Sequence, residues 1–282
     1  MTFATRMTCR TMLLAVSFAI AGCADLAGVR EFASLSASIT GSGELSARWR
    51  DTQQRLAAIP QPGDFPLKFS TGDRASVHQE TEKLLAVVTI YMETMGQLAA
   101  DNLPSVDTQV AGLTKSLSSL PGTPINPQRV EAIGILGKLL SLPLDSYRQT
   151  QVRKLIEQAD PPLQNIIVGL IQLAGIYRSD LNNERKTVGD WAALQVAGSG
   201  TTSANFLSRR CIVDLNRKYD DVELGLDAYV KALRVISGRH ESLVNGLATS
   251  ETIARTVQQL SASRLELIDA RDKIRIALAQ KI

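Results

Sequence analysis

Histidine and cysteine are the residue types best suited to binding metals or moving protons near neutral pH. This chain of 282 residues contains two histidines and three cysteines. His78 and Glu82 are about one helical turn apart, so on a helix both would lie on the same face. Two ligands are too few for a zinc site, which needs three or four, and neither HExxH nor Cys-x-x-Cys occurs. The sequence therefore predicts no metal site and no bound cofactor.

The other candidates for chemistry are isolated in the same way. His240 falls among regularly spaced apolar residues, so we expect a buried, hydrogen-bonded side chain that sets the register between helices. The stretch GSGTTSANF (198–206) has the glycines and hydroxyls of a phosphate-binding loop, but the lysine and the preceding strand are missing. A turn between two helices, capped by Ser203, fits this stretch better. We expect no catalytic residues and a protein that is not an enzyme.

The first 23 residues follow a different pattern. Arg6 and Arg10 precede a short apolar run, Met12–Ile20, and no acidic residue accompanies them. The run is shorter than the about 20 residues that span a bilayer as a helix, and it has the length of a signal-peptide apolar core. It leads into Ile20-Ala21-Gly22-Cys23, which resembles the lipobox of bacterial lipoproteins, in which an aliphatic residue and two small residues precede a cysteine.

This resemblance implies a signal peptide over residues 1–22 and a diacylglycerol thioether on Cys23, which becomes the acylated start of the mature protein. Two or three acyl chains suffice for stable anchoring, since each buried CH₂ contributes about 0.8 kcal/mol. Ala24 follows the cysteine where an aspartate would signal retention in the inner membrane. The resemblance therefore implies the periplasmic face of the outer membrane, with the inner membrane as the alternative because Asp25 comes next. The implied partner is a lipid bilayer, bound through Cys23.

Loss of the signal peptide removes Cys9, and acylation consumes Cys23, so Cys211 is left as a lone thiol without an intramolecular disulfide. It follows Arg209 and Arg210 near an expected helix start, where positive charge would favour a reactive thiolate. We expect instead a half-buried small residue beside an apolar seam. An intermolecular disulfide is the main alternative.

The charge balance excludes one class of partner. Arg6 and Arg10 are two of the 31 basic residues and leave with the signal peptide, so the remainder nearly balances the 28 acidic residues. Nucleic-acid surfaces need clustered Lys and Arg, and aromatic residues, at 5%, are too few for base stacking. We expect no nucleic-acid partner. The hydrophobic share of 44% is ordinary for a globular protein, and we assign residues 23–282 to a single helical periplasmic domain.

Apolar residues recur at alternating spacings of three and four in three parts of the chain, a pattern typical of coiled-coil helices. In the last of these seams Arg264 and Arg271 occupy seam positions, and a neighbouring stripe through Leu265 and Ile268 is an alternative to it. We expect both arginines at edges of a bundle or paired with acids. The three seams comprise Val77, Thr81, Leu84, Val88, Tyr91, Met95 and Leu98; Ile212, Leu215, Tyr219, Val222, Leu226, Tyr229, Leu233, Ile236, His240, Leu243 and Leu247; and Ile253, Val257, Leu260, Leu267, Ile274 and Leu278.

Shorter elements surround the seams. Residues 24–59 have helical spacing in two pieces, separated by the GSG at 41–43, and the segments 59–76 and 120–128 have the proline and glycine content of loops. Short helices are expected over 110–120, 130–140 and 146–160, the last ending at ADPPLQ (159–164), where proline stops one helix and starts another. We found no convincing strand pattern. The predicted fold is all-α: an elongated antiparallel bundle of long coiled-coil-like helices and shorter bracing helices.

Residues 163–177 (LQNIIVGLIQLAGIY) carry no charge. Such a helix could enter a membrane, as in helical pore-forming toxins, but it is shorter than a span. We expect it to be buried on most sides in the bundle.

Three classes of function follow from these patterns. The first is a membrane-anchored lipoprotein that binds a protein partner in the envelope, or braces an envelope assembly, without catalysis. The second is an effector-related role, either a toxin-immunity lipoprotein or an α-helical pore-former. The third is a small-molecule binder or enzyme with a site between helices. We favour the first, and long apolar seams would also allow a homo-oligomer.

Overall fold

A computed structural model describes residues 27–41, 43–58, 72–99, 132, 135–136, 148–198, 202–246 and 250–280. This part of the chain is almost entirely helical and contains no strand, which confirms the predicted all-α fold. The lipobox cysteine Cys23, the signal peptide 1–22 and the expected loop 120–128 lie outside the described residues.

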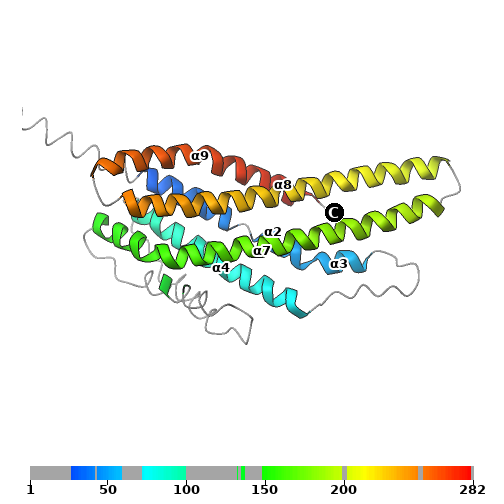
Figure 1. Ribbon diagram of the computed structural model, residues 1–282, viewed down its shortest axis with the longest axis horizontal. Coiled ribbons are helices and arrows are strands. Elements are labelled where there is room, and N and C mark those ends of the chain that lie inside the picture. Colours follow the sequence, from blue (N-terminus) through cyan, green and yellow to red (C-terminus); the bar gives the residue numbers. More distant parts are fainter. Residues whose placement is uncertain are drawn as a thin grey trace, which may run out of the picture.

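Three long helices run up and down beside one another, as Figure 1 shows. α7 and α8 are joined by a short connection and lie antiparallel, and α9 returns along α8 on the side away from α7. α4 packs against α7, with the helical residues 27–40, α2 and α3 completing the bundle. The bounds are α2 Glu44–Arg50, α3 Thr52–Ala57, α4 Gly72–Ala99, α7 Arg148–Gly198, α8 Thr202–Gly246 and α9 Ser250–Ala279.

The predicted seams face the core. On α8 the seam is buried from Tyr219 to Leu243, whereas Ile212 and Leu215 are half-buried. The seam of α4 is buried apart from Val77, which is half-buried. The seam positions Leu98, Leu247, Ile253 and Val257 lie outside what the structure describes of side chains.

The seam of α9 is confirmed at Leu260, Leu267 and Ile274, which are buried, while Leu278 is half-buried. The alternative stripe is wrong: Leu265 is 74% exposed.

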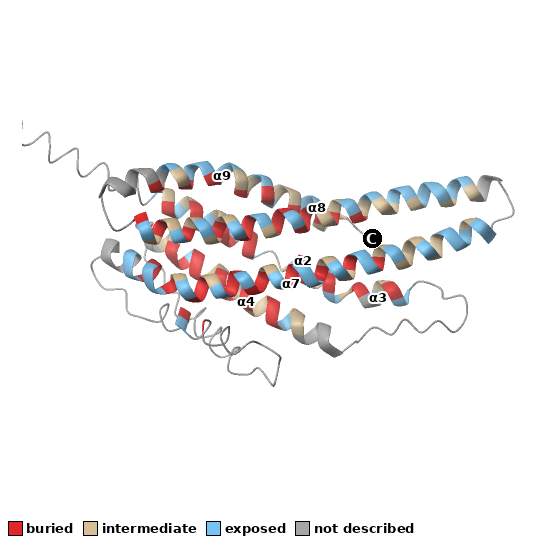
Figure 2. Cartoon of the chain, in the orientation of Figure 1, coloured by how far each residue is buried: buried red, intermediate tan, exposed pale blue. Residues whose placement is uncertain are grey.

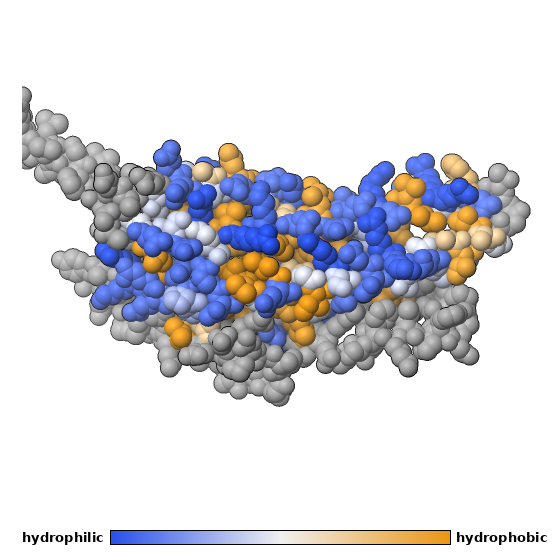
Figure 3. Space-filling model, viewed as in Figure 1, coloured by the Kyte–Doolittle hydropathy of each residue, from blue (hydrophilic) through white to orange (hydrophobic). Residues whose placement is uncertain are grey.

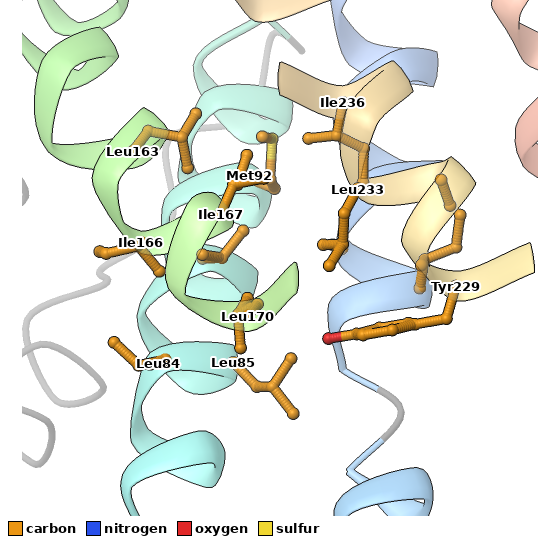
Figure 4. Packing of buried hydrophobic residues seen from close by; sticks show 14 of the residues in the cluster. Leu84, Leu85, Met92, Leu163, Ile166, Ile167, Leu170, Tyr229, Leu233 and Ile236 are labelled. Carbon is orange, nitrogen blue, oxygen red and sulfur yellow. The ribbon is translucent and has the colours of Figure 1, made fainter. Parts of the chain in front are cut away.

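Figure 4 shows the centre of the core, where α4, α7 and α8 meet. Side chains from all three helices interdigitate there at 6% exposure or less, so each helix covers the apolar stripe of the others. The labelled members are Leu84, Leu85, Met92, Leu163, Ile166, Ile167, Leu170, Tyr229, Leu233 and Ile236.

The expected helix break at 159–164 is wrong, because α7 continues through Pro161 and Pro162. Two prolines remove two backbone donors, and a proline inside a helix costs about 3 kcal/mol. The carbonyls that lose their donors belong to Glu157 and Gln158, which are exposed and therefore near water. Packing on both sides of the prolines, by Ile156 and other fully buried residues, keeps the helix continuous. The expected short helix 146–160 is thus the first part of a longer one.

Other expected helix boundaries agree more closely with the structure. Residues 27–40 are helical, a turn follows at Gly41, and α2 starts at Glu44, as the GSG stretch predicts. α4 begins at Gly72, so residues 72–76 are helical and the expected loop 59–76 is too long at its end; its residues 59–71 lie outside the described part. The expected helix 110–120 also lies outside it, and of 130–140 the structure describes residues 132, 135 and 136 as helical.

Candidate functional site

The paired helices α7 and α8 extend beyond the ends of their neighbours, toward the right in Figure 1. We call residues 185–198 of α7 and 202–218 of α8 the arm. No residue whose exposure is described in the arm is buried, and Figure 2 shows this change from red to pale blue along both helices. The last buried residues before the arm are Glu184 of α7 and Tyr219 of α8. Two helices alone can bury a narrow seam, whereas the body of the bundle encloses each helix from several sides.

The arm carries large apolar side chains that face solvent. Leu194 is 59% exposed, Phe206 63%, Leu207 62% and Val213 58%. In Figure 3 hydrophobic surface lies over the end of the arm. The indole N–H of Trp191, in the same region, is buried without a hydrogen-bond partner. We take these exposed apolar side chains on a projecting element as a candidate interaction surface.

A polar cluster fixes the root of the arm. The Arg55 guanidinium of α3 donates two hydrogen bonds to the Glu184 carboxylate, at 2.7 and 2.9 Å, and the Tyr219 hydroxyl donates a third at 3.3 Å. The Trp49 indole of α2 donates to Asp180 at 2.7 Å. Burial and the charge of Glu184 raise the pKa of Tyr219, so its hydroxyl remains a donor at neutral pH. These contacts tie α2 and α3 to the point where the arm leaves the bundle.

His240 has the buried, hydrogen-bonded position that the sequence predicts. Its Nδ1 lies 2.7 Å from Asp160 of α7, its Nε2 lies 2.5 Å from the Tyr91 hydroxyl of α4, and its exposure is 0%. The hydrogen bond from His240 lowers the pKa of Asp160, and burial raises the pKa of Tyr91. A ring with its proton on Nδ1 donates to Asp160 and accepts from Tyr91, which satisfies both nitrogens. The arrangement is a clamp between three helices rather than an open reactive site.

His78 and Glu82 share a helix face as expected, with 4.0 Å between Nδ1 and the carboxylate. Ser46 of α2 joins them, its hydroxyl 2.5 Å from the same nitrogen, while Nε2 lies 3.2 Å from Arg50. A hydrolytic relay needs the acid and the nucleophile on opposite ring nitrogens. Here both meet Nδ1, so this group is not arranged for nucleophilic catalysis. Among the described residues no three His, Cys, Asp or Glu side chains are grouped to hold a metal ion.

Cys211 does not match the sequence expectation. It is exposed rather than half-buried, because it lies on the arm, where none of the other described helices covers α8. It also lies well inside α8, which begins at Thr202, so it is not at a helix N-terminus.

The two seam arginines of α9 lie at bundle edges as expected. Arg264 pairs with Glu31 at 2.8 Å, and Arg271 pairs with Asp272 at 3.2 Å. Both guanidinium groups are about half exposed. Neither enters a shared cavity with His78, Glu82 or Cys211 among the described cavities.

Three concave features among the described residues could receive a ligand, and one of them is a groove of about 660 Å³ lined by Gly28, Glu31 and Ser261. A cavity of about 30 Å³ lies between α2, α4, α7 and α8, and its walls are mainly leucine and aromatic side chains. Burial raises the pKa of Tyr177, on its wall, to about 12. A wider groove of about 860 Å³ runs between residues 30–41 and α4, with Arg30 and Glu93 among its lining residues. This wider groove is also lined by Ser34 and Ser38, but among the described contacts no hydrogen bond links either serine to the Glu93 carboxylate, and Ser38 donates to the Leu35 carbonyl instead.

The uncharged stretch 163–177 packs inside the bundle, as expected. Leu163, Ile166, Ile167 and Leu170 are at most 1% exposed, while Val168 and Ile176 face outward. Among the described helices none is long and apolar enough to cross a membrane.

Sequence reasoning missed the partners of the buried groups. Asp160 accepts a hydrogen bond from His240, and Glu184 accepts one from Arg55, and in both pairs the residues are distant in sequence. Nothing in the local sequence distinguishes Asp160 from other acids next to apolar residues. Glu184 had one signal in the sequence: it follows Tyr177 and Leu181 at helical spacing, so on a helix it falls on the same face as these apolar residues, where an unpaired carboxylate would be costly.

No protein-family model matches the chain, and comparisons with curated proteins and with solved structures found no match either. The arm is therefore the candidate functional site on the geometry of this chain alone.

Proposed function

We propose that this protein is a lipid-anchored bacterial envelope lipoprotein whose helical domain binds a protein partner through the arm and catalyses no reaction. The observation that carries the proposal is the arm itself, which projects from the bundle and exposes Leu194, Phe206, Leu207 and Val213. Burying one such side chain against a partner contributes about 1.5–3 kcal/mol. The root contacts of Arg55 and Trp49 support a fixed direction for the arm.

The placement of the two ends supports the anchor. Residue 27 begins its helix at the end of the bundle opposite the tip of the arm, as Figure 1 shows. A tether at Cys23 would hold the bundle near that end and direct the arm away from the membrane surface. α8 has 45 residues, about 68 Å at 1.5 Å per residue, so the arm would reach well beyond the lipid headgroups.

The alternatives have less support. Pore formation would require residues 163–177 to leave the core, where they pack against α4 and α8. An enzyme or small-molecule binder needs convergent polar groups in a cleft. The cavity of about 30 Å³ is mainly apolar, and in the groove of about 860 Å³ no described hydrogen bond joins the polar groups Ser34, Ser38 and Glu93 to one another. A toxin-immunity role is a special case of partner binding and would use the same arm.

The anchor and the arm can be tested separately. Cys23→Ala should abolish acyl labelling and release the protein from the membrane fraction. For the arm, a photo-crosslinking amino acid in place of Leu194 should capture an envelope protein in cells. The matched control is the same amino acid in place of Val168, which is 53% exposed on the body of the same helix. Continued membrane attachment of Cys23→Ala contradicts the anchor, and equal capture at both positions contradicts the arm.

A further inference from the structure

The arm differs from the rest of the chain in charge. It holds six of the 31 basic residues but only two of the 28 acidic ones, an excess of four positive charges in a chain whose formal net charge is +3. The rest of the chain is therefore nearly balanced, and the positive charge is concentrated on the part of α7 and α8 that projects from the bundle. The basic residues are Arg185, Lys186, Arg209, Arg210, Arg217 and Lys218, and the acidic ones are Asp190 and Asp214.

Three of these cations have no ion-pair partner among the described residues. Arg185 pairs with Asp220 at 2.7 Å, and Lys186 pairs with Asp190 at 2.5 Å. By contrast, three exposed arginines of α8 form no ion pair with any described side chain, so their charges are available to another molecule. They are Arg209, Arg210 and Arg217.

The three arginines share one face of α8 with two exposed apolar side chains. Phe206 and Val213 are seven residues apart, about two helical turns, so one lies above the other along the helix. Arg209, Arg210 and Arg217 follow Phe206 by three, four and eleven residues, and these spacings place them on the same side. We call these five residues the arginine face.

The arginine face lies where the cover of α8 has stopped. In the body α9 lies against α8 so closely that a Cβ placed on Gly225 would be 2.2 Å from the Cβ of Ala277, but α9 ends at Ala279. Beyond this end α8 continues toward the tip of the arm, as Figure 1 shows. All five residues of the face are exposed. A helix lying along them would therefore displace no described helix.

The composition of the face favours a protein with acidic side chains as the partner. Arginine and aromatic residues are enriched at protein interfaces, where lysine is depleted. A guanidinium binds a carboxylate through two parallel hydrogen bonds, as Arg55 does with Glu184 at the root of the arm. Anionic bilayers are recognised by clusters of about four to eight basic residues, and this face has three.

We propose that the arginine face binds an acidic amphipathic helix of a protein partner. Apolar side chains of that helix cover Phe206 and Val213, and its glutamates or aspartates pair with the three arginines. The partner thus adds a third helix to the two-helix arm, packed side by side as the helices of the body are. This inference rests on the proposed function, in which the arm binds the partner, and it names the chemistry of that partner.

The test measures binding of synthetic peptides to the full-length protein in detergent. The probe is a helical peptide with leucines two turns apart, flanked on both sides by glutamates, and the control peptide has the same residues in shuffled order. The protein should bind the probe at least about tenfold more tightly than the shuffled peptide, because only the probe presents its leucines and glutamates on one face. Fluorescence anisotropy of labelled peptides gives both dissociation constants.

Substitutions show whether the probe binds at the arginine face. Arg210→Glu combined with Arg217→Glu should weaken its binding at least about tenfold, because like charges then face each other. Phe206→Ala should weaken it about fivefold or more through lost apolar contact. The matched control is Arg234→Glu combined with Arg275→Glu, two exposed arginines of the body that pair with no described acid, and it should change binding by less than about twofold.

The same face can be tested in cells. A photo-crosslinking amino acid in place of Val213 should capture a protein through a peptide rich in glutamate or aspartate, and Arg210→Glu combined with Arg217→Glu should abolish this capture. Capture from position 194 without capture from position 213 overturns the arginine face and leaves the proposed function intact. Absence of capture from both positions contradicts the inference and the proposed function together.

Other results would also overturn the inference. These are equal binding of the probe and the shuffled peptide, and an equal loss of binding in the body control. For the bilayer alternative, the protein is inserted into phosphatidylcholine vesicles and mixed with phosphatidylglycerol vesicles. Association of the two populations that Arg210→Glu with Arg217→Glu removes, and that the probe peptide does not displace, would assign the face to a membrane. Circular dichroism of each variant should match the wild type, since all the exchanged side chains are exposed.

Discussion

The body of the bundle and the arm are built from the same two helices, yet they differ in what covers them. In the body, α7 and α8 are enclosed by α4, α9 and the N-terminal helices, and their seams are buried. In the arm, the same helices continue with half-buried seams and exposed leucine, phenylalanine and valine side chains. Apolar residues in the arm are therefore exposed because the neighbouring described helices end, and not because the helical pattern ends.

The root of the arm marks the boundary between the two regions. Glu184 is 1% exposed and accepts hydrogen bonds from Arg55 and Tyr219. A buried carboxylate strongly destabilises a protein unless cations and hydrogen-bond donors surround it. The polar root therefore lies at the boundary where enclosure of α7 and α8 by the other described helices stops.

The largest expected difference between the regions comes from one substitution made twice on α7. Leu170→Ala, in the body beside the cavity of about 30 Å³, should lower the free energy of unfolding by about 3–5 kcal/mol. Leu194→Ala, in the arm, should change it by less than about 0.5 kcal/mol. Chemical denaturation followed by circular dichroism measures both. Similar losses at the two positions would show that the arm is enclosed in solution.

Much of this architecture could be predicted from the sequence because it depends on local periodicity. The seams of α4, α8 and α9 follow from the spacing of residues such as Leu84, Leu233 and Leu267, and the structure confirms them. Proline was misleading at Pro161 and Pro162, since tertiary packing outweighs a local cost of about 3 kcal/mol each. Where the neighbouring helices end could not be predicted, because it depends on contacts between distant segments.

Among the candidate site residues, too, some could be predicted from local pattern and others depend on distant segments. His240 could be predicted as a buried polar residue because it interrupts an apolar seam. Its partners Tyr91 and Asp160 come from other helices, and no local pattern identifies them. Cys211 was expected to be half-buried, and its exposure follows from its place on the arm, beyond the ends of the other helices that the structure describes.

Glycine should have opposite effects in the two regions. Gly225→Ala in the body should destabilise the protein by about 1–3 kcal/mol, because the new Cβ would be 2.2 Å from that of Ala277. Adding Ala277→Gly should recover part of the loss. Gly189→Ala in the arm meets no atom within 4 Å and should stabilise the helix by about 0.5–1 kcal/mol. Thermal unfolding measures all three, and a stabilising Gly225→Ala would mean that α9 is not held against α8.

A fall in pH should change the effect of a substitution at Asp160 in the body but not of one at Asp190 in the arm. The hydrogen bond from His240 lowers the pKa of Asp160 below its ordinary value of 3.8, so the charged form stabilises the fold above that pH. Asp160→Asn should cost about 1–2 kcal/mol at pH 7, and the difference from the wild type should shrink as the pH falls below about 4. Asp190→Asn in the arm, where the carboxylate is 65% exposed, should show little pH-dependent difference. Unfolding curves between pH 7 and 3 measure this difference in unfolding free energy. A difference that does not change with pH would show that the Asp160 carboxylate does not accept a stabilising hydrogen bond from His240.

The smallest expected effect is on an ion pair of the arm. Lys186 lies 2.5 Å from Asp190 one turn further along α7, and both side chains are mostly exposed. Water and salt screen such pairs, so Lys186→Ala should change the free energy of unfolding by less than about 0.5 kcal/mol. The effect should shrink further in 1 M salt. A loss above about 1 kcal/mol would mean that this ion pair is buried. The side of the arm that carries Lys186 would then be covered in solution, unlike the exposed arm of this structure.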